Sequence, residues 1–330
     1  MDIVKLLTFW KKPSRNYVGI LEEKYGLSKY SIIDIVKSFL VDKSKVFLDG
    51  KYTYQNLGGS NNYGFVAYIS KHNNWIAKIA PEKLLQREAI FFEYHKNNFN
   101  EETGFAPNSM GYGSFENTDL EFLTLEKLAP SKKITLDQVY KLYSKSRDGQ
   151  KLFDGGLLEA APEIDTGTRI KDILTFLVCD FKSKKAKSYI DSFFIERMSA
   201  LPDYSDELSH LQSVIDMNYE LLKDVDASLI GFVHGDFKKS NMMLDSKQQL
   251  KLIDFQYYCQ GIRVWDLAFY FSKSKLSFSK GLGVILDKLS TENERKYLAF
   301  LYIFALLLHS KESAFEKDKF KPVLGYLKLK

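Results

Sequence analysis

Three short segments with strand-like patterns follow one another in the first third of the chain. They are residues 51–56, 64–69 and 75–80, and each carries aromatic or β-branched side chains. Residues 70–74 have the polar composition of a turn, and Pro81 stops the third segment. The pattern predicts an antiparallel meander.

Segments with helical spacing flank this meander. In residues 31–40 apolar side chains recur at i, i+3 and i+4, so we expect residues 1–45 to form a helical N-terminal extension. Residues 84–97 have similar spacing and predict a helix after the third strand. Residues 120–128 return to a strand pattern, and the Pro130 that follows is typical of a connection between lobes.

Helical spacing dominates the chain beyond Pro130. The clearest amphipathic or buried stretches are residues 189–198, 207–222 and 295–309. Three short strand patterns interrupt them, at residues 229–233, 242–244 and 250–253. This order of elements predicts an α+β fold of two lobes, with an antiparallel sheet in the first and mainly helices in the second.

Length and composition agree with two packed lobes. The chain has 330 residues, of which 45% are apolar and 27% charged, as in soluble globular proteins. The net charge of +5 comes with scattered lysines that are not interleaved with aromatic residues, so no nucleic-acid partner is expected.

No segment predicts export or membrane insertion. The N-terminal apolar run 3–10 is broken by Lys5 and no small-residue cleavage site follows it, so we expect a cytoplasmic protein without a membrane partner. Cys179 and Cys259 show no metal-ligand spacing and are expected to be buried, reduced thiols.

The clearest chemical pattern lies between residues 231 and 268. Asn241 follows Asp236 by five positions, and Asp254 follows Asn241 by thirteen. In phosphoryl transfer one aspartate can orient a hydroxyl and accept its proton, while an asparagine and a second aspartate hold Mg²⁺ at the nucleotide phosphates. We therefore assign Asp236 as catalytic and Asn241 and Asp254 as metal ligands. Each alone could merely cap a turn, but their order between apolar strands favours the phosphotransferase interpretation.

This block resembles the aminoglycoside phosphotransferase and choline kinase superfamily, a small-molecule branch of the protein-kinase-like fold. His234-Gly-Asp236 is similar to the family's His-Gly-Asp or His-Asn-Asp motif. Asn241 matches the metal-binding asparagine, and Asp254 matches the acid of the Asp-Phe-Gly motif of protein kinases. Gln256 departs from the glutamate common in the family and looks like the ecdysteroid-kinase-like branch, which weakens a specific choline assignment. The resemblance implies a two-lobed, protein-kinase-like fold.

A glycine-rich stretch is the first candidate on the nucleotide side. Gly58, Gly59, Ser60 and Asn61 lie between two predicted strands, where glycines let backbone amides approach phosphate oxygens. Gly and Asn are also ordinary turn residues. Gly-Gly-Ser-Asn is nevertheless similar to the loop that covers the phosphates in small-molecule kinases.

Lys78 is the second candidate, because it interrupts an otherwise apolar strand, where a charge needs a partner or a ligand. Glu88 on the following predicted helix is the expected partner, and Glu93 is the alternative. The lysine could instead extend to water from an edge strand. The resemblance implies that Lys78 holds the nucleotide phosphates and that Glu88 orients it.

The remaining candidates carry less specific patterns. The resemblance places adenine binding on backbone groups at Glu126 and Leu128. Asp266 is expected to be a helix N-cap or the partner of Arg263, and His234 a scaffold residue.

Substrate recognition stays open between two side-chain sets. Aromatic residues after the motif could form a cation–π box for a quaternary amine or simply pack in the core; they are Tyr257, Tyr258, Trp265, Phe269 and Tyr270. Acidic residues of the helical lobe could face an amino sugar; they are Glu159, Glu163, Asp165 and Asp172.

The sequence thus predicts a kinase that moves the γ-phosphate of ATP or GTP directly to a hydroxyl of a small molecule. The acceptor classes are aminoglycosides, choline or other amino alcohols, sugars and related metabolites. The expected domains are the extension 1–45, a nucleotide-binding lobe 46–128 and a helical lobe 129–330 with the catalytic loop. The alternatives are a nucleotide-binding pseudokinase scaffold and a protein kinase, although no long activation segment separates Asp254 from Asp266.

Overall fold

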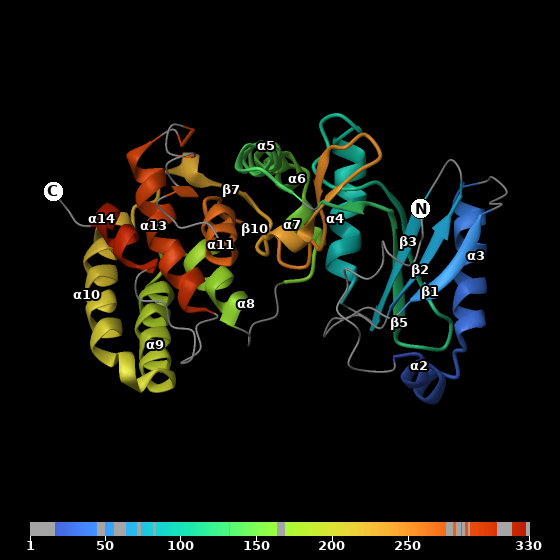
Figure 1. Cartoon of the computed structure of the whole chain (residues 1–330), viewed down its shortest axis with the longest axis horizontal. Coiled ribbons are helices and arrows are strands. Elements are labelled where there is room, and N and C mark those ends of the chain that lie inside the picture. Colours follow the sequence, from blue (N-terminus) through green and yellow to red (C-terminus); the bar gives the residue numbers. More distant parts are fainter. Residues whose placement is uncertain are drawn as a thin grey trace. The chain divides into compact units, whose positions relative to one another are not determined.

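The computed structural model divides the chain into two compact units, whose elements are labelled in Figure 1. The first unit consists of Met1–Lys132, Gly155–Pro162 and Met242–Gln256, and the remaining segments form the second. The structure describes residues 17–44, 50–55, 64–70, 74–81, 84–131, 133–163, 169–274, 280–281, 285, 288–289, 291–308 and 319–327. Among those residues, no helix combines the length and the apolar character needed to cross a membrane.

A five-stranded antiparallel sheet forms the centre of the first unit. Its strands run in the order β1-β2-β3-β5-β4. They are β1 (Lys51–Gln55), β2 (Gly64–Ile69), β3 (Asn74–Pro81), β4 (Ser109–Ser114) and β5 (Leu120–Glu126). The predicted meander is confirmed by the antiparallel pairs β1–β2 and β2–β3. Sequence analysis missed β4, because its sequence, Ser-Met-Gly-Tyr-Gly-Ser, lacks an apolar alternation.

Two N-terminal helices, α2 (Tyr17–Tyr25) and α3 (Lys29–Ser44), cover one face of this sheet. Val36 and Leu40 of α3 are buried in one cluster with Val66 and Ile79 of the strands. The helices are therefore part of the core of the first unit, and the helical character expected of residues 1–45 is confirmed for the residues described there. Its apolar spacing indicated a helix but not the surface that this helix covers.

The opposite face of the sheet meets α4 (Gln86–Asn98), as Figure 1 shows. Side chains alternate along a strand, so Phe65 and Ile76 lie on this face, away from the cluster that contains Val66 and Ile79. Lys78 pairs with Phe65 across β2 and β3 and shares its face. The pleat of β3 thus directs the one charged side chain of this strand toward α4.

A second, three-stranded sheet completes the first unit. It has the order β6-β8-β9, with β6 (Ala129–Pro130), β8 (Met242–Leu244) and β9 (Leu250–Leu252). The β8–β9 hairpin, which sequence analysis grouped with the helical lobe, belongs to the first unit because β8 pairs with β6. The short helix α7 (Leu157–Ala160) also belongs to this unit.

The second unit is mainly helical, as predicted. Its α-helices are α5 (Leu136–Ser146), α6 (Gln150–Asp154), α8 (Arg169–Ile173), α9 (Lys184–Ala200), α10 (Ser205–Leu222), α11 (Trp265–Lys273), α13 (Glu292–Leu307) and α14 (Lys321–Leu327). A π-helix spans Leu174–Cys179, and short 3-10 turns span Arg147–Gly149, Pro202–Tyr204, Ala227–Leu229 and Lys239–Asn241. The strands β7 (Ile230–Val233) and β10 (Cys259–Ile262) form an antiparallel pair.

Aromatic side chains fill the core between the helices of the second unit. Phe181 contacts Tyr219, Tyr297 and Phe300, and Phe193 contacts Phe304. These rings come from α9, α10, α13 and the turn before α9. The high aromatic content of the chain is therefore explained in large part by packing.

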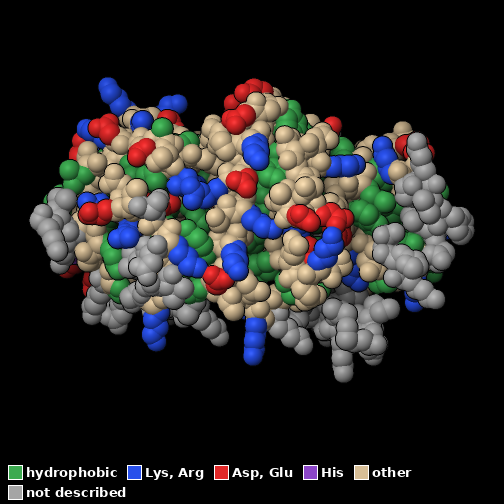
Figure 2. Space-filling model, turned by 90° about the horizontal axis from the view of Figure 1, so that it is seen from above, with side chains coloured by type: hydrophobic (Ala, Val, Ile, Leu, Met, Phe, Trp, Pro, Cys, Tyr) green, Lys and Arg blue, Asp and Glu red, His purple; other side chains and the backbone are tan. Residues whose placement is uncertain are grey.

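Two features of the surface bear on the expectations from sequence. Cys259 is buried as predicted, but Cys179 is exposed at the end of the π-helix, and both are free thiols. Figure 2 shows lysine and arginine side chains interspersed with acidic and neutral ones on the face in view.

Substitution of Leu40 by alanine should test the role of α3. Leu40 is buried under the sheet, so Leu40→Ala should lower the free energy of unfolding by about 3 kcal/mol. Lys37→Ala, on the exposed side of the same helix, should change it by less than about 0.5 kcal/mol. Urea unfolding measures both, and equal stabilities of the two variants would contradict the packing described.

Candidate active site

The loop that carries Asp236 starts where β7 ends, and its backbone is tightly constrained. Gly235 has φ +86°, and a Cβ at this position would lie 2.6 Å from the carbonyl oxygen of Tyr257. Only glycine combines this conformation with so close an approach. The His234-Gly-Asp236 sequence is thus explained locally by a sharp turn that aims Asp236 out of the strand.

Asp266, the second residue of α11, binds the backbone of this loop. The N–H groups of His234 and Gly235 donate to its two carboxylate oxygens at 2.9 and 3.0 Å. The indole N–H of Trp265 donates to the carbonyl of Gly235 at 3.0 Å. The expectation that Asp266 caps α11 or pairs with Arg263 was wrong: Val264 occupies the N-cap position, and Arg263 pairs with Glu294. Asp266 acts instead as a fully buried anchor for the loop.

The side chains of the loop hold one another in place. Asn241 donates through its amide nitrogen to the backbone oxygen of Asp236 and to its Oδ2, both at 2.9 Å. Lys238 donates to the same Oδ2 at 2.5 Å. Nδ1 of the buried His234 accepts the N–H of Asp236, so His234 is a scaffold residue here. The loop therefore presents a carboxylate with a fixed orientation.

In the first unit, the amine of Lys78 lies between two carboxylates. Its Nζ is 2.8 Å from Oε2 of Glu88 and 2.8 Å from Oδ1 of Asp254. The predicted pairing with Glu88 is confirmed, whereas Glu93 is exposed on the same helix. Burial alone would lower the pKa of Lys78, but the carboxylates of Asp254 and Glu88 outweigh it and raise the pKa, so the amine stays charged.

Asp254 occupies an unusual backbone conformation, with φ +69° in the left-handed region. Phe255, the next residue, holds the backbone after Asp254. Its N–H donates to Oε1 of Glu88 at 3.3 Å, and its ring stacks on that of Phe91 with the ring centroids 3.8 Å apart. Glu88 thus bonds both Lys78 and the backbone after Asp254. A non-glycine residue in this region costs of order 1 kcal/mol or more and is typical of functional sites.

Part of the chain matches a known family, and most of it matches solved structures in fold. Residues 168–316, which include Asp236, Asn241 and Asp254, match the family model of choline/ethanolamine kinases. The solved structure of a spectinomycin phosphotransferase with ADP and spectinomycin covers 91% of this chain and 98% of its own, at 10% identity and a TM-score of 0.55. The GDP complex of a mutant aminoglycoside 2′-phosphotransferase covers 89% and 96%, at 12% identity and a TM-score of 0.52. No curated protein sequence matches.

Over residues 168–316 the chain is therefore similar to choline/ethanolamine kinases, and over most of its length it shares the fold of aminoglycoside phosphotransferases. It is a small-molecule kinase, and its protein-kinase-like fold, with an antiparallel sheet in one unit and mainly helices in the other, is the predicted one. The family model spans the catalytic loop and leaves the sheet of the first unit outside its range.

The residues predicted to bind adenine and the phosphates differ in how far the structure describes them. The N–H groups of Glu126 and Lys127 already donate to Asn108 and Asn74, both at 2.8 Å, which leaves Leu128 as the donor to consider for adenine. Gly58, Gly59, Ser60 and Asn61 lie outside the described residues, between β1 and β2. Within the described part of the chain, no group of three or more His, Cys, Asp and Glu side chains could hold a metal ion by itself.

The aromatic cation–π box is not formed by the residues considered for it. Tyr258, Trp265, Phe269 and Tyr270 are all buried, and Trp265 is bonded to the catalytic loop. Only Tyr257 is partly exposed. Core packing, the alternative left open from sequence, is therefore their role. Asp165 lies outside the described residues, and Glu159 and Glu163 are exposed.

Sequence analysis missed two groups of this site. Lys238 stands two positions after Asp236, a spacing that could have suggested a contact within the loop. Lys273, in the last turn of α11, has its pKa lowered to about 8, mainly by burial and then by the charge of Lys238, while Asp236 opposes the shift. Two lysines that the motif alone did not indicate, one in the loop and one on α11, therefore act on the environment of Asp236.

Asp266→Asn should change how stability depends on pH. Burial is the largest cause that raises the pKa of Asp266, from an ordinary 3.8 to about 7, against the two backbone N–H groups. The contribution of the protonated carboxyl to stability is therefore complete below pH 3.8 and is lost as the pH rises through about 7, on the order of 4 kcal/mol in total. Urea unfolding from about pH 5 to pH 8 should show this decline in the wild type and lack it in the variant.

Asp203→Asn is the matched control, because Asp203 is an exposed aspartate of the same unit. It should keep the decline of the wild type. An identical decline in the Asp266→Asn variant would contradict the titration of Asp266.

Proposed function

We propose that this kinase transfers the terminal phosphate of a nucleoside triphosphate to a hydroxyl group of a small molecule, with Asp236 as the catalytic residue. The observation that carries the proposal is the catalytic loop, in which Lys238 and Asn241 both donate to one oxygen of Asp236. A fixed carboxylate can orient a hydroxyl for in-line attack on phosphorus. The O–P bond to the acceptor forms, the bond to the leaving nucleoside diphosphate breaks, and the hydroxyl proton passes to Asp236.

The oxygen donors of Asn241 and Asp254 fit Mg²⁺, which prefers hard ligands and takes one or two protein groups together with phosphates and waters. The amide nitrogen of Asn241 is used by Asp236, so its Oδ1, which lies 3.5 Å from the Ser240 hydroxyl, is the atom that would face a metal. Bound Mg²⁺ would neutralise charge on the phosphates. The chain's own contribution is to hold these two oxygens in place.

Lys78 is the proposed phosphate-binding cation of the first unit. Its charge is maintained by Glu88 and Asp254, and it lies on β3. We propose that the stretch with Gly58, Gly59, Ser60 and Asn61, which precedes β2 in sequence, covers the phosphates. We propose Leu128, with the backbone at Glu126, for adenine. The ADP and GDP bound in two similar structures support a nucleotide as co-substrate.

The acceptor belongs to the broad class of hydroxylated small molecules. Spectinomycin in one similar structure and choline or ethanolamine in the family name define the first compounds to try. The burial of Tyr258, Trp265 and Phe269 removes the most direct argument for a quaternary amine. A panel of aminoglycosides, amino alcohols and sugars therefore gives each class equal weight.

Asp236→Asn should lower kcat with the best acceptor of this panel by about 10²- to 10⁴-fold, because the amide cannot accept the hydroxyl proton. The dissociation constant of the nucleotide should change by less than about threefold, since Asp236 belongs to the reacting hydroxyl in this scheme. ADP release measures the first quantity and calorimetry the second. Asp203→Asn should leave both unchanged. Full transfer by the Asp236→Asn variant would overturn the assignment, and nucleotide binding without transfer to any acceptor in the wild type would favour a pseudokinase.

Lys78→Met should weaken both stability and nucleotide binding. It leaves Glu88 buried without its cation, which should cost about 3 kcal/mol, and should raise the nucleotide dissociation constant about tenfold or more. The double variant Lys78→Met/Glu88→Gln should regain much of the stability, because Gln can still accept the N–H of Phe255, but not the binding.

Glu93→Gln is the control for Glu88→Gln on the exposed side of α4 and should have little effect on either quantity. Thermal unfolding and calorimetry report the two quantities separately. Recovery of nucleotide binding in the double variant would contradict a direct role of Lys78.

A further inference from the structure

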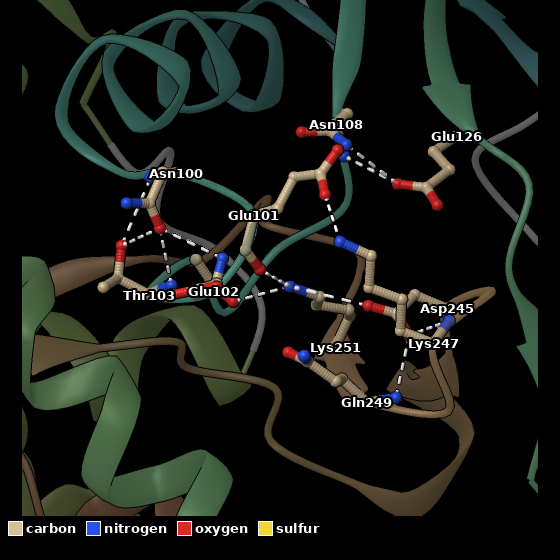
Figure 3. Close-up of polar contacts among 11 residues, drawn as sticks. Asn100, Glu101, Glu102, Thr103, Asn108, Glu126, Asp245, Lys247, Gln249 and Lys251 are labelled. Carbon is tan, nitrogen blue, oxygen red and sulfur yellow. Dashed lines mark hydrogen bonds and ion pairs between the residues drawn. The ribbon is translucent and has the colours of Figure 1, made fainter.

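A buried lysine lies in β9, the strand that directly precedes Asp254, and its hairpin is drawn in Figure 3. Lys251 of β9 has a side chain only 5% exposed. Its amine donates to the backbone carbonyls of Glu101 and Gly104 at 3.1 and 2.8 Å, and the carboxylate of Asp245 is 3.8 Å away. An ammonium group with these partners is compensated although it is buried.

The carbonyls that Lys251 binds belong to the loop that follows α4. A Cβ at Gly104 would lie 2.8 Å from the carbonyl of Asn100 and 3.0 Å from His95, so this loop is closely packed. Burial, and secondarily the charge of Lys251, lower the pKa of His95 to about 3, so its ring is neutral. The loop thus offers carbonyl oxygens to the amine, and it continues the helix that carries Glu88.

The backbone of β9 is attached to the same loop at a second point. The N–H of Leu252 donates to the carbonyl of Phe105 at 2.7 Å. Two residues further on, Asp254 adopts its left-handed conformation and bonds Lys78. Such a conformation persists only where the surrounding structure determines it, and the attachments of Lys251 and Leu252 lie directly before it in the chain.

We propose that Lys251 is a positioning residue that holds Asp254 in the conformation required for binding Mg²⁺ and Lys78. Its hydrogen bonds attach β9 to the loop that follows α4. This attachment fixes the distance between α4 and β9, so Glu88 and Asp254 both reach the amine of Lys78. The role as metal ligand rests on the proposed function of Asp254. The attachment itself rests on the contacts of Lys251 alone.

The same hairpin provides a matched control. Lys247 also contacts this loop, through the side chain of Glu101, but its side chain is 58% exposed and that of Glu101 63%. Exposed pairs of this kind contribute little to stability. Lys247→Met and Lys251→Met thus make the same chemical change, at an exposed and a buried contact to one loop.

Amide hydrogen exchange of the ligand-free protein tests the attachment without any metal. In Lys251→Met, residues 252–256 should exchange about tenfold faster than in the wild type, while residues 120–126 of β5 keep the wild-type rate. Lys247→Met should match the wild type in both segments. A uniform increase over the whole first unit, or no change in residues 252–256, would overturn the positioning role.

Kinetics and calorimetry test the consequence for metal binding. The Mg²⁺ concentration for half-maximal transfer should rise about tenfold in Lys251→Met, as should the dissociation constant of the Mg²⁺–nucleotide complex, whereas KM for the acceptor stays the same. Lys251→Arg, which keeps donors for both carbonyls, should recover most of the loss. If Lys251→Met does not fold, Lys251→Gln, with one remaining donor group, is measured instead and should show a smaller change in the same direction.

The outcomes separate this proposal from the proposed function. A wild-type protein that transfers phosphate, with unchanged Mg²⁺ dependence in Lys251→Met, would overturn the positioning role alone. A wild-type protein without transfer would overturn the proposed function, and faster exchange confined to residues 252–256 would still support the attachment.

Discussion

An ammonium group buried between two carboxylates determines how the first unit is built. A charge removed from water without partners costs several kcal/mol, so Lys78 requires anions within contact distance. Glu88 comes from α4 and Asp254 from the chain after β9, and both reach Nζ at 2.8 Å. The pleat of β3 separates this polar arrangement from the apolar cluster under α3. The sheet therefore has one apolar face packed under α3 and one face that carries the buried ammonium group.

The second unit contains a buried acidic group, Asp266, instead of a buried cation. Asp266 is fully buried, and its partners are backbone N–H groups of the catalytic loop instead of a cation. Two peptide donors compensate a carboxylate without adding a side chain, so the loop can turn sharply at Gly235 and still be held. In both units a buried charge fixes the backbone next to a residue of the proposed reaction: Asp254 in one and Asp236 in the other.

The pairing of Lys78 with Glu88, which joins two side chains, was accessible from sequence. Lys78 was recognised because it interrupts an apolar strand, and Glu88 because it follows on the next helix. Asp266 and Lys251 were not assigned their roles, because they bind backbone atoms of segments distant in sequence, which leave no residue pattern. The β1–β2–β3 meander and the five longest helices of the described residues were predicted from periodicity. Periodicity could not show that α3 covers the sheet or that the β8–β9 hairpin joins β6. The aromatic residues after the motif were ambiguous for the same reason, since burial depends on the fold.

The two charge arrangements respond differently to protons. Lys78 has a raised pKa and keeps its charge across the range in which proteins are usually folded, because two carboxylates surround it. Asp266, with a pKa of about 7, and Lys273, with a pKa of about 8, change charge close to neutrality, and both interact with the loop of Asp236 or with its side chains. Two groups that change charge near neutral pH therefore lie around the loop of Asp236. They would make turnover depend on pH between about pH 6 and pH 9 through the environment of Asp236, while Lys78, the proposed phosphate-binding cation, keeps its charge.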